Sequence, residues 1–530
     1  MVVFSLIFSL ISLIFNLIVW ILLLSLPFGV AYYFYLKHRS TYFQRIGLSQ
    51  PPITSIFLGN LEEFEKDHKQ HEKLVEWHEK YGPTFGMLQG AHRVIVTSDM
   101  NILNEVFVKQ FHTFQARMIH PSFVVDQVNG RQLTLFFSQG NQWKRLRALF
   151  SSSLTISKIK SVEPIMEKAH DELYQVFKKN ENKVIDIIPN ILDMTFAFIS
   201  RSALGINEEF GKSEYLHKIV NILGPEETSK SLISSFFAGT WDFLSITKHF
   251  QILQFLTVFR EAFKLRDNII KAITERENEP PTSTRRRDFL DFLREAQEED
   301  FDTTNKPDLD MKIPKKITRD ELIGASMAYL FGGADTTATL INYCLYELTM
   351  HPECEEIILQ EIDDYIKNED DVNYNNVKNL EFLDRFIKET GRLHPFAYLA
   401  AMRRAIESAT VQTSNGNLLQ IDKHTAILPN MIVISKDENV WGKDAAEFNP
   451  DRFLPENSKN RHPLAWMLFG AGPRICPGKN LAIYETKATL IRLLQEFKFE
   501  LHEKSKLNEV TKTFMSFESL KMKIIPRKIE

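Results

Sequence analysis

The chain opens with a long apolar run that no charge interrupts. Residues 1–36 are aliphatic, aromatic or small and neutral, and a basic cluster from Lys37 to Arg39 follows directly. About 20 apolar residues suffice to span a bilayer, and the run has neither a charged start nor a clear cleavage site of small residues. The pattern therefore predicts a retained transmembrane helix over 1–36 that ends or kinks near Pro27, and the basic cluster places the remaining chain in the cytosol.

Behind this segment, a Pro/Gly-punctuated connector predicts a stiff hinge up to residue 60. Strand-like alternation occurs at 92–98 and again at 409–435. Within the second stretch, Asn415-Gly416 stands between alternating apolar residues, which predicts a hairpin. Most of the remaining chain has the spacing of helices.

The longest predicted helix runs from residue 318 to Pro352. Thr318 and Glu321 form a capping box at its start, and the proline marks its end. Its middle carries Gly332 and Gly333, followed by Asp335, Thr336 and Thr337. Two glycines cost a helix about 2 kcal/mol relative to alanine. A solvent-facing polar patch or a helix-packing contact explains part of this pattern, and a groove lined by a carboxyl and a hydroxyl explains all of it.

Composition narrows the class of protein. The 530 residues carry a net charge of −4, which argues against a nucleic-acid-binding protein. The three cysteines, at 344, 354 and 476, are too few and too scattered for a disulfide framework or a zinc site, and they suit a reducing compartment. Cys476 lies in "FGAGPRICPG", among glycines and prolines that favour neither helix nor strand. Its thiol is either a structural group or a ligand that the glycines make accessible.

Five motifs then coincide in order along the chain. The stretch Phe469–Gly478 resembles the haem-binding loop of the cytochrome P-450 superfamily, and Gly332–Thr337 resembles the family's oxygen-activation motif. Glu389–Arg392 resembles its Glu-x-x-Arg helix, Pro450–Phe453 the arginine element joined to that helix, and Trp143–Arg147 its Trp-x-x-x-Arg helix. The resemblance implies a mainly α fold, with one large helical haem-binding body and a small β-rich lobe. We accordingly expect a membrane anchor at 1–36, a hinge at 37–60 and a haem-thiolate monooxygenase domain at 61–530.

The resemblance also implies the cofactor and its ligand. Cys476 would be the axial thiolate of haem b, a ligand that favours O–O cleavage. Phe469 would shield the sulfur, and the glycines at 472 and 478 would let the backbone approach the porphyrin. Cationic and indole groups would bind the haem propionates; these are Trp143, Arg147, Arg474 and Arg404, with Arg403 left open as the alternative to Arg404.

The same resemblance implies which residues take part in catalysis and where the electrons come from. Thr336 and Asp335 would be catalytic, because a hydroxyl and a carboxyl can relay the protons that dioxygen reduction consumes. Glu389, Arg392 and Arg452 would form a structural buried network. Since the chain lacks a flavin or nicotinamide motif, electrons would come from an NADPH-dependent flavoprotein reductase, with cytochrome b5 as a second donor. The basic residues expected to dock the reductase are Lys144, Arg145, Lys459, Arg461 and Lys479.

By the same resemblance, the substrate pocket would be lined by the aromatic-rich stretches 119–137 and 233–244, by 328–334 and 395–400, and by Phe514. Because these stretches are largely apolar, we expect a hydrophobic substrate. The resemblance is greatest to the animal microsomal group that oxidises drugs and steroids, so a steroid, fatty acid or foreign lipophile is expected. The expected location is the endoplasmic reticulum membrane, with a single pass and a cytosolic catalytic domain. A haem-thiolate isomerase or dehydratase and a non-catalytic haem sensor remain as alternatives.

Overall fold

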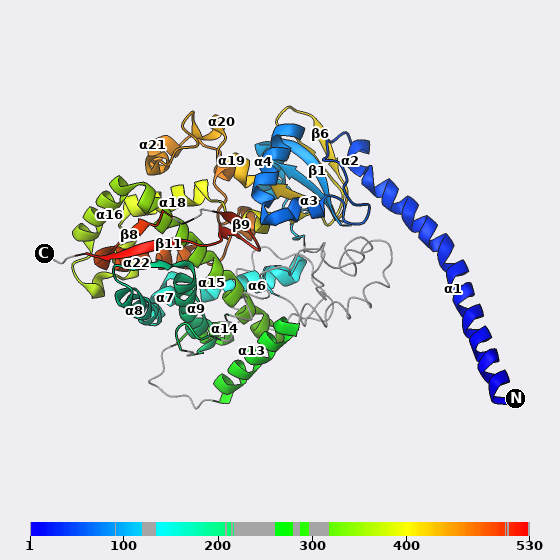
Figure 1. The fold of residues 1–530 in the computed structure, drawn as a ribbon. Helices are drawn as coiled ribbons and strands as arrows, with labels where there is room; N and C mark the ends of the chain where they lie inside the picture. The colour runs from blue at the N-terminus through cyan, green and yellow to red at the C-terminus, as the bar shows by residue number, and fades with distance from the viewer. Residues whose placement is uncertain are drawn as a thin grey trace.

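The computed structural model describes residues 2–90, 92–118, 134–206, 209–213, 216, 260–278, 287–295, 317–503, 505 and 508–527. A long N-terminal helix leaves the body, and the two chain ends lie on opposite sides of the molecule (Figure 1). The elements of the N-terminal part are α1 (Val2–Ser40), α2 (Tyr42–Arg45), α3 (Leu61–Glu65), η1 (Lys66–His68), α4 (Gln70–Tyr81), β1 (Thr84–Gln89), β2 (His92–Thr97), α5 (Met100–Asn104) and η2 (Glu105–Lys109).

Helices dominate the described middle of the chain and surround one central helix, α15. These elements are α6 (Gly140–Ser153), α7 (Ile156–Ser161), α8 (Glu163–Lys179), β3 (Val184–Asp186), α9 (Ile188–Leu204), α13 (Arg260–Asn278), α14 (Phe289–Glu295) and α15 (Arg319–Met350).

The C-terminal part mixes helices with short strands. Its helices and turns are α16 (Pro352–Tyr365), η5 (Glu369–Asp371), α17 (Tyr374–Val377), α18 (Glu381–Leu393), η6 (Tyr398–Ala401), α19 (Met431–Ile434), α20 (Glu438–Trp441), η7 (Pro450–Phe453), α21 (Pro455–Ser458), η8 (Pro463–Ala465), η9 (Gly472–Arg474) and α22 (Lys479–Glu496). Its strands are β4 (Arg403–Arg404), β5 (Ala409–Gln412), β6 (Leu418–Ile421), β7 (Ala426–Pro429), β8 (Phe497–Leu501), β9 (Glu509–Thr511), β10 (Met515–Phe517) and β11 (Lys521–Pro526).

The strands form small sheets beside a mainly helical body, as predicted. The largest has the order β1-β2-β7-β4, and the others are β3-β11-β8, β5-β6 and β9-β10. The strand expected at 92–98 is β2, and the predicted hairpin is β5-β6, with Gly416 at φ +81° in its turn. The strand predicted up to residue 435 is wrong beyond Pro429. There the Asn430 side chain accepts a hydrogen bond from the Val433 N–H and caps the short helix α19.

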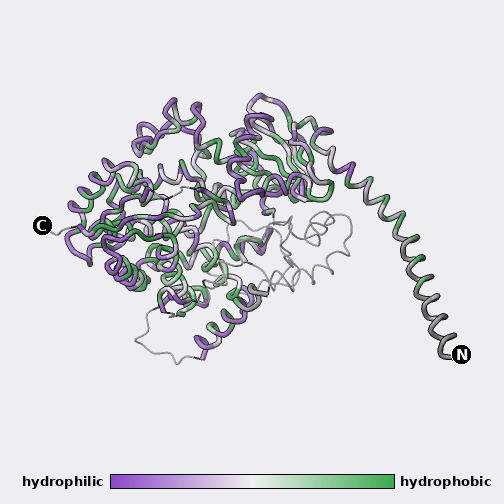
Figure 2. The backbone as a smooth tube through the Cα atoms, viewed as in Figure 1, coloured by the Kyte–Doolittle hydropathy of each residue, from purple (hydrophilic) through white to green (hydrophobic). Residues whose placement is uncertain are grey.

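Helix α15 has the predicted start and length. Thr318 accepts from the Glu321 N–H at 3.2 Å, and the Glu321 carboxylate accepts from the Thr318 N–H at 2.8 Å, which completes the capping box. The helix packs against α9, α13, α18 and α22, so it lies at the centre of the body. Hydrophobic segments gather in this central region, while hydrophilic ones prevail in the outer helices and loops (Figure 2).

The N-terminal helix differs from its prediction. Helix α1 does not end near Pro27; it contains that residue and continues to Ser40. Arg39 near its end donates to the carbonyls of Ile56 and Phe57 at 3.2 and 3.1 Å, which ties the helix to the connector. The transmembrane helix expected over 1–36 is not found: among the helices of the described residues, none combines the length and apolar character needed to cross a bilayer. The division of the chain at residues 36 and 60 stays a prediction.

Candidate haem-thiolate site

The cysteine loop connects a 3-10 turn to a long helix. The Cys476 N–H donates to the carbonyl of Phe469 at 2.8 Å, and α22 begins three residues after the cysteine, at Lys479. As expected, the residues between Phe469 and Gly478 form neither α-helix nor strand. The loop is therefore folded back on itself by its own backbone, and the cysteine lies close to the start of α22.

The two loop glycines predicted to approach the porphyrin have different surroundings. A Cβ on Gly478 would lie 3.9 Å from the Cys476 Sγ. Gly472 has φ +65°, and a Cβ there would lie 2.1 Å from the backbone oxygen of Phe107. The packing of η9 against η2 is thus what excludes a side chain at 472, and contact of this glycine with the cofactor stays a prediction.

One cavity collects most of the predicted site residues. It has an empty volume of about 1440 Å³, its open mouth included. The predicted residues among its lining are Trp143, Arg147, Thr336, Phe469, Arg474, Cys476 and Gly478. Arg404, Gly472 and Asp335 are not part of the lining.

Four arginines give this cavity a strongly cationic region. Arg117, Arg147, Arg403 and Arg474 all line it, and among the described lining residues the only acidic side chain is Glu485. Arg147 donates to the carbonyl of Ile475 at 2.5 Å, and Arg403 donates to the carbonyl of Ala401 at 2.9 Å. In the described lining, the guanidinium groups of Arg147 and Arg403 are therefore stabilised by backbone carbonyl dipoles, and no carboxylate forms an ion pair with them.

Three of these four arginines keep buried nitrogens that have no hydrogen-bond partner among the described residues. These atoms are Nε of Arg117, Nε and Nη2 of Arg403, and Nε of Arg474. Burial, with repulsion from Arg117 and Arg147, lowers the pKa of Arg474 to about 9, and burial lowers the pKa of Arg117 to about 10. Buried cations with unsatisfied donors call for an anionic ligand that accepts several hydrogen bonds, and the carboxylates of a haem meet this requirement.

The set of arginines at the cavity differs from the predicted set in two positions. Arg403, not Arg404, lines the cavity, because neighbouring residues of strand β4 face opposite sides of the sheet. Arg404 lies 3.5 Å from the Gln139 side chain instead. Arg117 was not among the predicted site residues, because it reaches the cavity only through the tertiary fold.

Trp143 and Arg474 form one unit at the cavity wall. The Arg474 guanidinium lies over the Trp143 ring, 4.7 Å from its centroid, and donates to the carbonyl of Ser138. A cation stacked on an indole keeps its orientation. The two predicted residues therefore support each other.

The surroundings of Cys476 keep its thiol protonated unless a metal ion binds to the sulfur. Burial raises the pKa of its thiol, against the opposing effect of the Gly478 and Lys479 backbone N–H groups and of Arg147 and Arg117. A coordinating metal ion deprotonates such a thiol outright. Cys344 and Cys354 are buried elsewhere and are not part of the cavity lining.

Above the cysteine loop, α15 brings Thr336 to the cavity. The Thr336 hydroxyl donates to the carbonyl of Gly332 at 2.6 Å. A Cβ on Gly332 would meet no atom within 4 Å, whereas a Cβ on Gly333 would lie 2.8 Å from Ile199 Cγ1. Both glycines therefore border the cavity, and Gly333 also allows α9 to pack closely. The groove interpretation holds for both glycines and the helix-packing interpretation for Gly333, in a helix that is uninterrupted.

Asp335 lies next to Thr336 on a different side of α15. Burial raises the pKa of this carboxyl to about 6, and the positive charge of Lys512 partly opposes the increase. The group can thus take up and release protons near neutrality. It lies outside the cavity lining, so a role in catalysis would be indirect.

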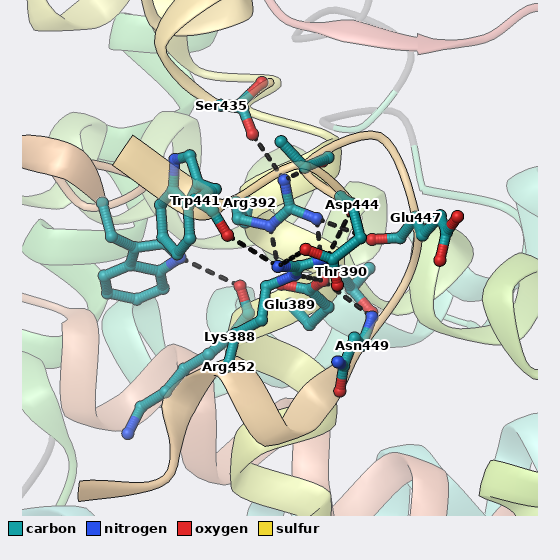
Figure 3. A network of polar contacts seen from close by, with 12 residues as sticks. Lys388, Glu389, Thr390, Arg392, Ser435, Trp441, Asp444, Glu447, Asn449 and Arg452 are labelled. Atoms are coloured by element: carbon teal, nitrogen blue, oxygen red, sulfur yellow. Dashed lines mark hydrogen bonds and ion pairs between the residues drawn. The ribbon is translucent and has the colours of Figure 1, made fainter. Parts of the chain in front are cut away.

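The predicted structural network is present, and Glu389, Arg392 and Arg452 are all buried. Arg392 donates to both carboxylate oxygens of Glu389 at 2.7 Å, and Arg452 approaches the same carboxylate at 3.3 Å (Figure 3). Arg392 also donates to the carbonyls of Ala445 and Glu447, at 2.6 and 2.9 Å. The network joins α18 to the segment that precedes the cysteine loop. A Cβ on Gly391 would lie 2.3 Å from the side chain of Leu468, a cavity residue.

The basic cluster assigned to reductase docking is smaller than predicted. Arg145 is paired with Glu321 at 2.7 Å and is nearly buried, so it is removed from the cluster. Arg461 is half-buried over the rings of Trp441 and Phe453. Lys144 and Lys459 are exposed, and Lys479 lies over the Trp466 ring.

The rest of the cavity wall is apolar. Among the predicted substrate stretches, Leu135, Phe136, Phe396, Ala397 and Phe514 line it. Residues 119–133 and 233–244 of the predicted stretches lie outside the described residues. The described wall is sufficient to give the cavity a hydrophobic character.

A helical body, an accessible cysteine loop and an anion-requiring arginine cluster around one apolar cavity define a haem-thiolate protein. The family model described as Cytochrome P450 matches residues 49–526, and the chain belongs to this family. One similar curated protein is the putative cytochrome P450 cyp-13B1 of Caenorhabditis elegans, which is 29% identical over 93% of this chain and 97% of its own length. Another is the putative cytochrome P450 CYP13A2 of the same organism, 29% identical over 88% and 90%.

Membership establishes the cofactor and the reaction class. The family uses haem b with a cysteine thiolate as axial ligand, and its enzymes are monooxygenases. When bound, the haem supplies the activation of dioxygen. In this chain Cys476 would ligate the iron, and Arg117, Arg147, Arg403 and Arg474 would hold the carboxylates.

Proposed function

We propose that the protein is a membrane-bound monooxygenase that inserts one oxygen atom into a hydrophobic small molecule of the steroid, fatty acid or xenobiotic class. The observation that carries the proposal is the placement of Cys476 in a largely apolar cavity together with four arginines, three of which keep buried nitrogens without a hydrogen-bond partner among the described residues. An apolar pocket with a few polar groups selects lipophilic ligands. Phe396, Ala397 and Phe514 would pack against such a substrate and exclude water.

The chain's own residues account for the proton supply. Thr336 presents a hydroxyl at the cavity wall, and Asp335 carries a carboxyl with a pKa of about 6 on the neighbouring position. Thr336 would hold a proton at Oγ1 facing the substrate, and Asp335 would replenish it from the solvent side. A positioned acid of nearly neutral pKa is suited to this task.

Electrons would come from an NADPH-dependent flavoprotein reductase, with cytochrome b5 as a second donor. The exposed Lys144 and Lys459 and the partly exposed Lys479 support docking of an acidic partner near the cysteine loop. Reversing Lys144 and Lys459 to Glu should slow reduction of the haem by reductase while haem content is unchanged. An unchanged reduction rate would rule out this surface.

We further propose attachment to the endoplasmic reticulum membrane through the N-terminal segment, with the body in the cytosol. The uncharged run at 1–36 supports this location, as do the exposed Trp20, Phe28 and Phe34 of α1. Full-length chain should sediment with microsomes after alkaline carbonate washing, and a chain that begins at residue 37 should not. Equal sedimentation of both would overturn the proposal.

The central experiment is spectroscopic and then catalytic. Purified holoenzyme, reduced with dithionite and exposed to CO, should show the red-shifted Soret band of a thiolate complex; Cys476→Ser should lose it, and the matched variant Cys354→Ser should keep it. With reductase, NADPH and a panel of steroids and fatty acids, product should form with oxygen from O₂. A thiolate band without any oxygenated product would instead favour an isomerase, a dehydratase or a sensor.

A further inference from the structure

A buried histidine outside the arginine cluster connects three parts of the fold. His394 follows the last residue of α18, and its side chain is 13% exposed. Its Nε2 lies 2.6 Å from Glu347 Oε1 on α15, and its Nδ1 lies 3.2 Å from Glu509 Oε1 on β9. One imidazole thus contacts a carboxylate of the central helix and a carboxylate of the C-terminal hairpin.

The surroundings favour the doubly protonated ring. Burial alone lowers the pKa of His394, but the two carboxylates reverse this and raise it above its usual value. The pKa of Glu509 is lowered in turn, because its hydrogen bond and charge interaction with His394 outweigh its burial. An imidazolium that donates from both nitrogens bridges the two carboxylates, which a neutral ring cannot do with both at once.

Other groups hold the ring in place. The Tyr343 ring stacks on it with a centroid separation of 4.1 Å and an interplanar angle of 16°, and the Tyr346 ring lies edge-on at 6.1 Å. His351 lies 3.4 Å from the second oxygen of Glu347, on the more exposed side. On the hairpin side, burial lowers the pKa of His71, which contacts the Thr511 hydroxyl at 3.0 Å. Among the described residues, Glu347 and Glu509 are therefore the anionic groups that face His394.

The hairpin that His394 holds forms part of the cavity. Phe514, in the turn between β9 and β10, lines the cavity wall. The Met515 N–H donates to the carbonyl of Phe396, a second wall residue, at 3.0 Å. The same turn carries Lys512, the charge that opposes the raised pKa of Asp335. A shift of β9 would therefore move the wall and the environment of Asp335 together.

We propose that His394 is a positioning residue that determines ligand size selectivity, because its bridge from Glu347 to Glu509 fixes the hairpin carrying Phe514 over the cavity. The inference rests on the proposed function, since it assumes that ligands bind in this cavity. His394 is not part of the described cavity lining. It acts through the hairpin.

The test compares a small and a large haem-binding probe. Imidazole and 4-phenylimidazole are titrated into purified holoenzyme and followed by the Soret shift, in wild type, His394→Gln, Glu509→Gln and the double variant. Affinity for 4-phenylimidazole should fall about tenfold in each single variant, with that for imidazole unchanged, and the double variant should be no worse than the singles, because both remove one bridge.

His351→Gln is the matched control. It removes a histidine from the same Glu347 carboxylate but leaves the hairpin bridge intact, so both affinities should stay at wild-type values. The proposal is overturned if His394→Gln and Glu509→Gln behave like this control, or if both probes lose affinity equally. It is also overturned if neither variant folds while His351→Gln does, since the role is then only structural.

A second measurement does not depend on haem. Amide hydrogen exchange over 508–517 should be faster in His394→Gln and Glu509→Gln than in wild type and His351→Gln. Unchanged exchange would overturn the bridge itself. If exchange responds as expected but the wild-type holoenzyme shows no thiolate band, the bridge stands and the proposed function fails.

Discussion

The Arg392 guanidinium donates to both carboxylate oxygens of Glu389 at 2.7 Å, and neither side chain has any exposed surface. A bidentate pair of this kind is stable only while both charges are present, since a single buried charge has no compensation. Because Arg452 shares the same carboxylate, the loss of Glu389 would leave two buried arginines without it.

Glu389→Ala should therefore lower the free energy of unfolding by about 3–5 kcal/mol. Urea denaturation followed by circular dichroism measures this, together with haem content after purification. Asp451→Asn is the control, because it removes the 3.5 Å pair between the exposed Asp451 and Arg385, which joins the same segments. That pair should contribute less than about 1 kcal/mol, and equal losses in both variants would contradict the assigned role of the buried pair.

The neighbouring glycines of α15 should respond oppositely to alanine. Gly333→Ala brings a Cβ within 2.8 Å of Ile199 Cγ1, so overpacking should cost about 1–3 kcal/mol of stability. Gly332→Ala meets no atom within 4 Å and should gain up to about 1 kcal/mol from helix propensity. Thermal unfolding of the two variants measures the difference, and a more stable Gly333→Ala would contradict the close packing with α9.

Asp335 should give turnover a pH dependence near 6. The protonated carboxyl is the form that donates, and its pKa of about 6 means that this form declines as the pH rises above 6. Product formation per NADPH should decline over the same range. Asp335→Asn should lower turnover about a hundredfold and remove this pH dependence, with CO binding unaffected. A wild-type-like profile in Asp335→Asn would exclude the carboxyl from the relay.

Glu485 should make the fold less stable at high pH. This cavity residue is 2% exposed, its Oε1 has no hydrogen-bond partner among the described residues, and burial raises its pKa well above the usual value. A folded-state pKa above the unfolded one means that stability is lost as the pH rises from the unfolded value to the folded value.

Glu485→Gln removes this titration, so its stability relative to wild type should increase with pH. The gain amounts to about 1.4 kcal/mol for each unit by which the two pKa values differ. Urea midpoints at pH 5 and pH 8 measure it. A difference that shrinks toward pH 8 would show that the carboxyl is ionised in the folded protein.

Elements determined by neighbouring residues could be predicted from the sequence. The Thr318–Glu321 capping box and Asn415-Gly416 specify a helix start and a hairpin turn through bonds within a few residues. The irregular backbone of the cysteine loop could be predicted for the same reason, because its glycines and prolines exclude regular structure locally, whereas its ligand role was implied by the family resemblance. These short-range interactions do not depend on where the rest of the chain lies.

Tertiary structure decided which side chains reach the cavity. Arg403 and Arg404 are equivalent in sequence, and the pairing of β4 with β7 decides that Arg403 faces inward. Arg117 lines the cavity together with residues of the C-terminal part, and the His394 bridge joins residues 47 and 115 positions apart in the chain. Met431–Ile434 became a helix although its residues favour a strand. The sequence by itself determined the local elements and the ligand loop. The shape and charge of the site were decided by long-range packing, because burial and strand pairing are properties of the whole fold.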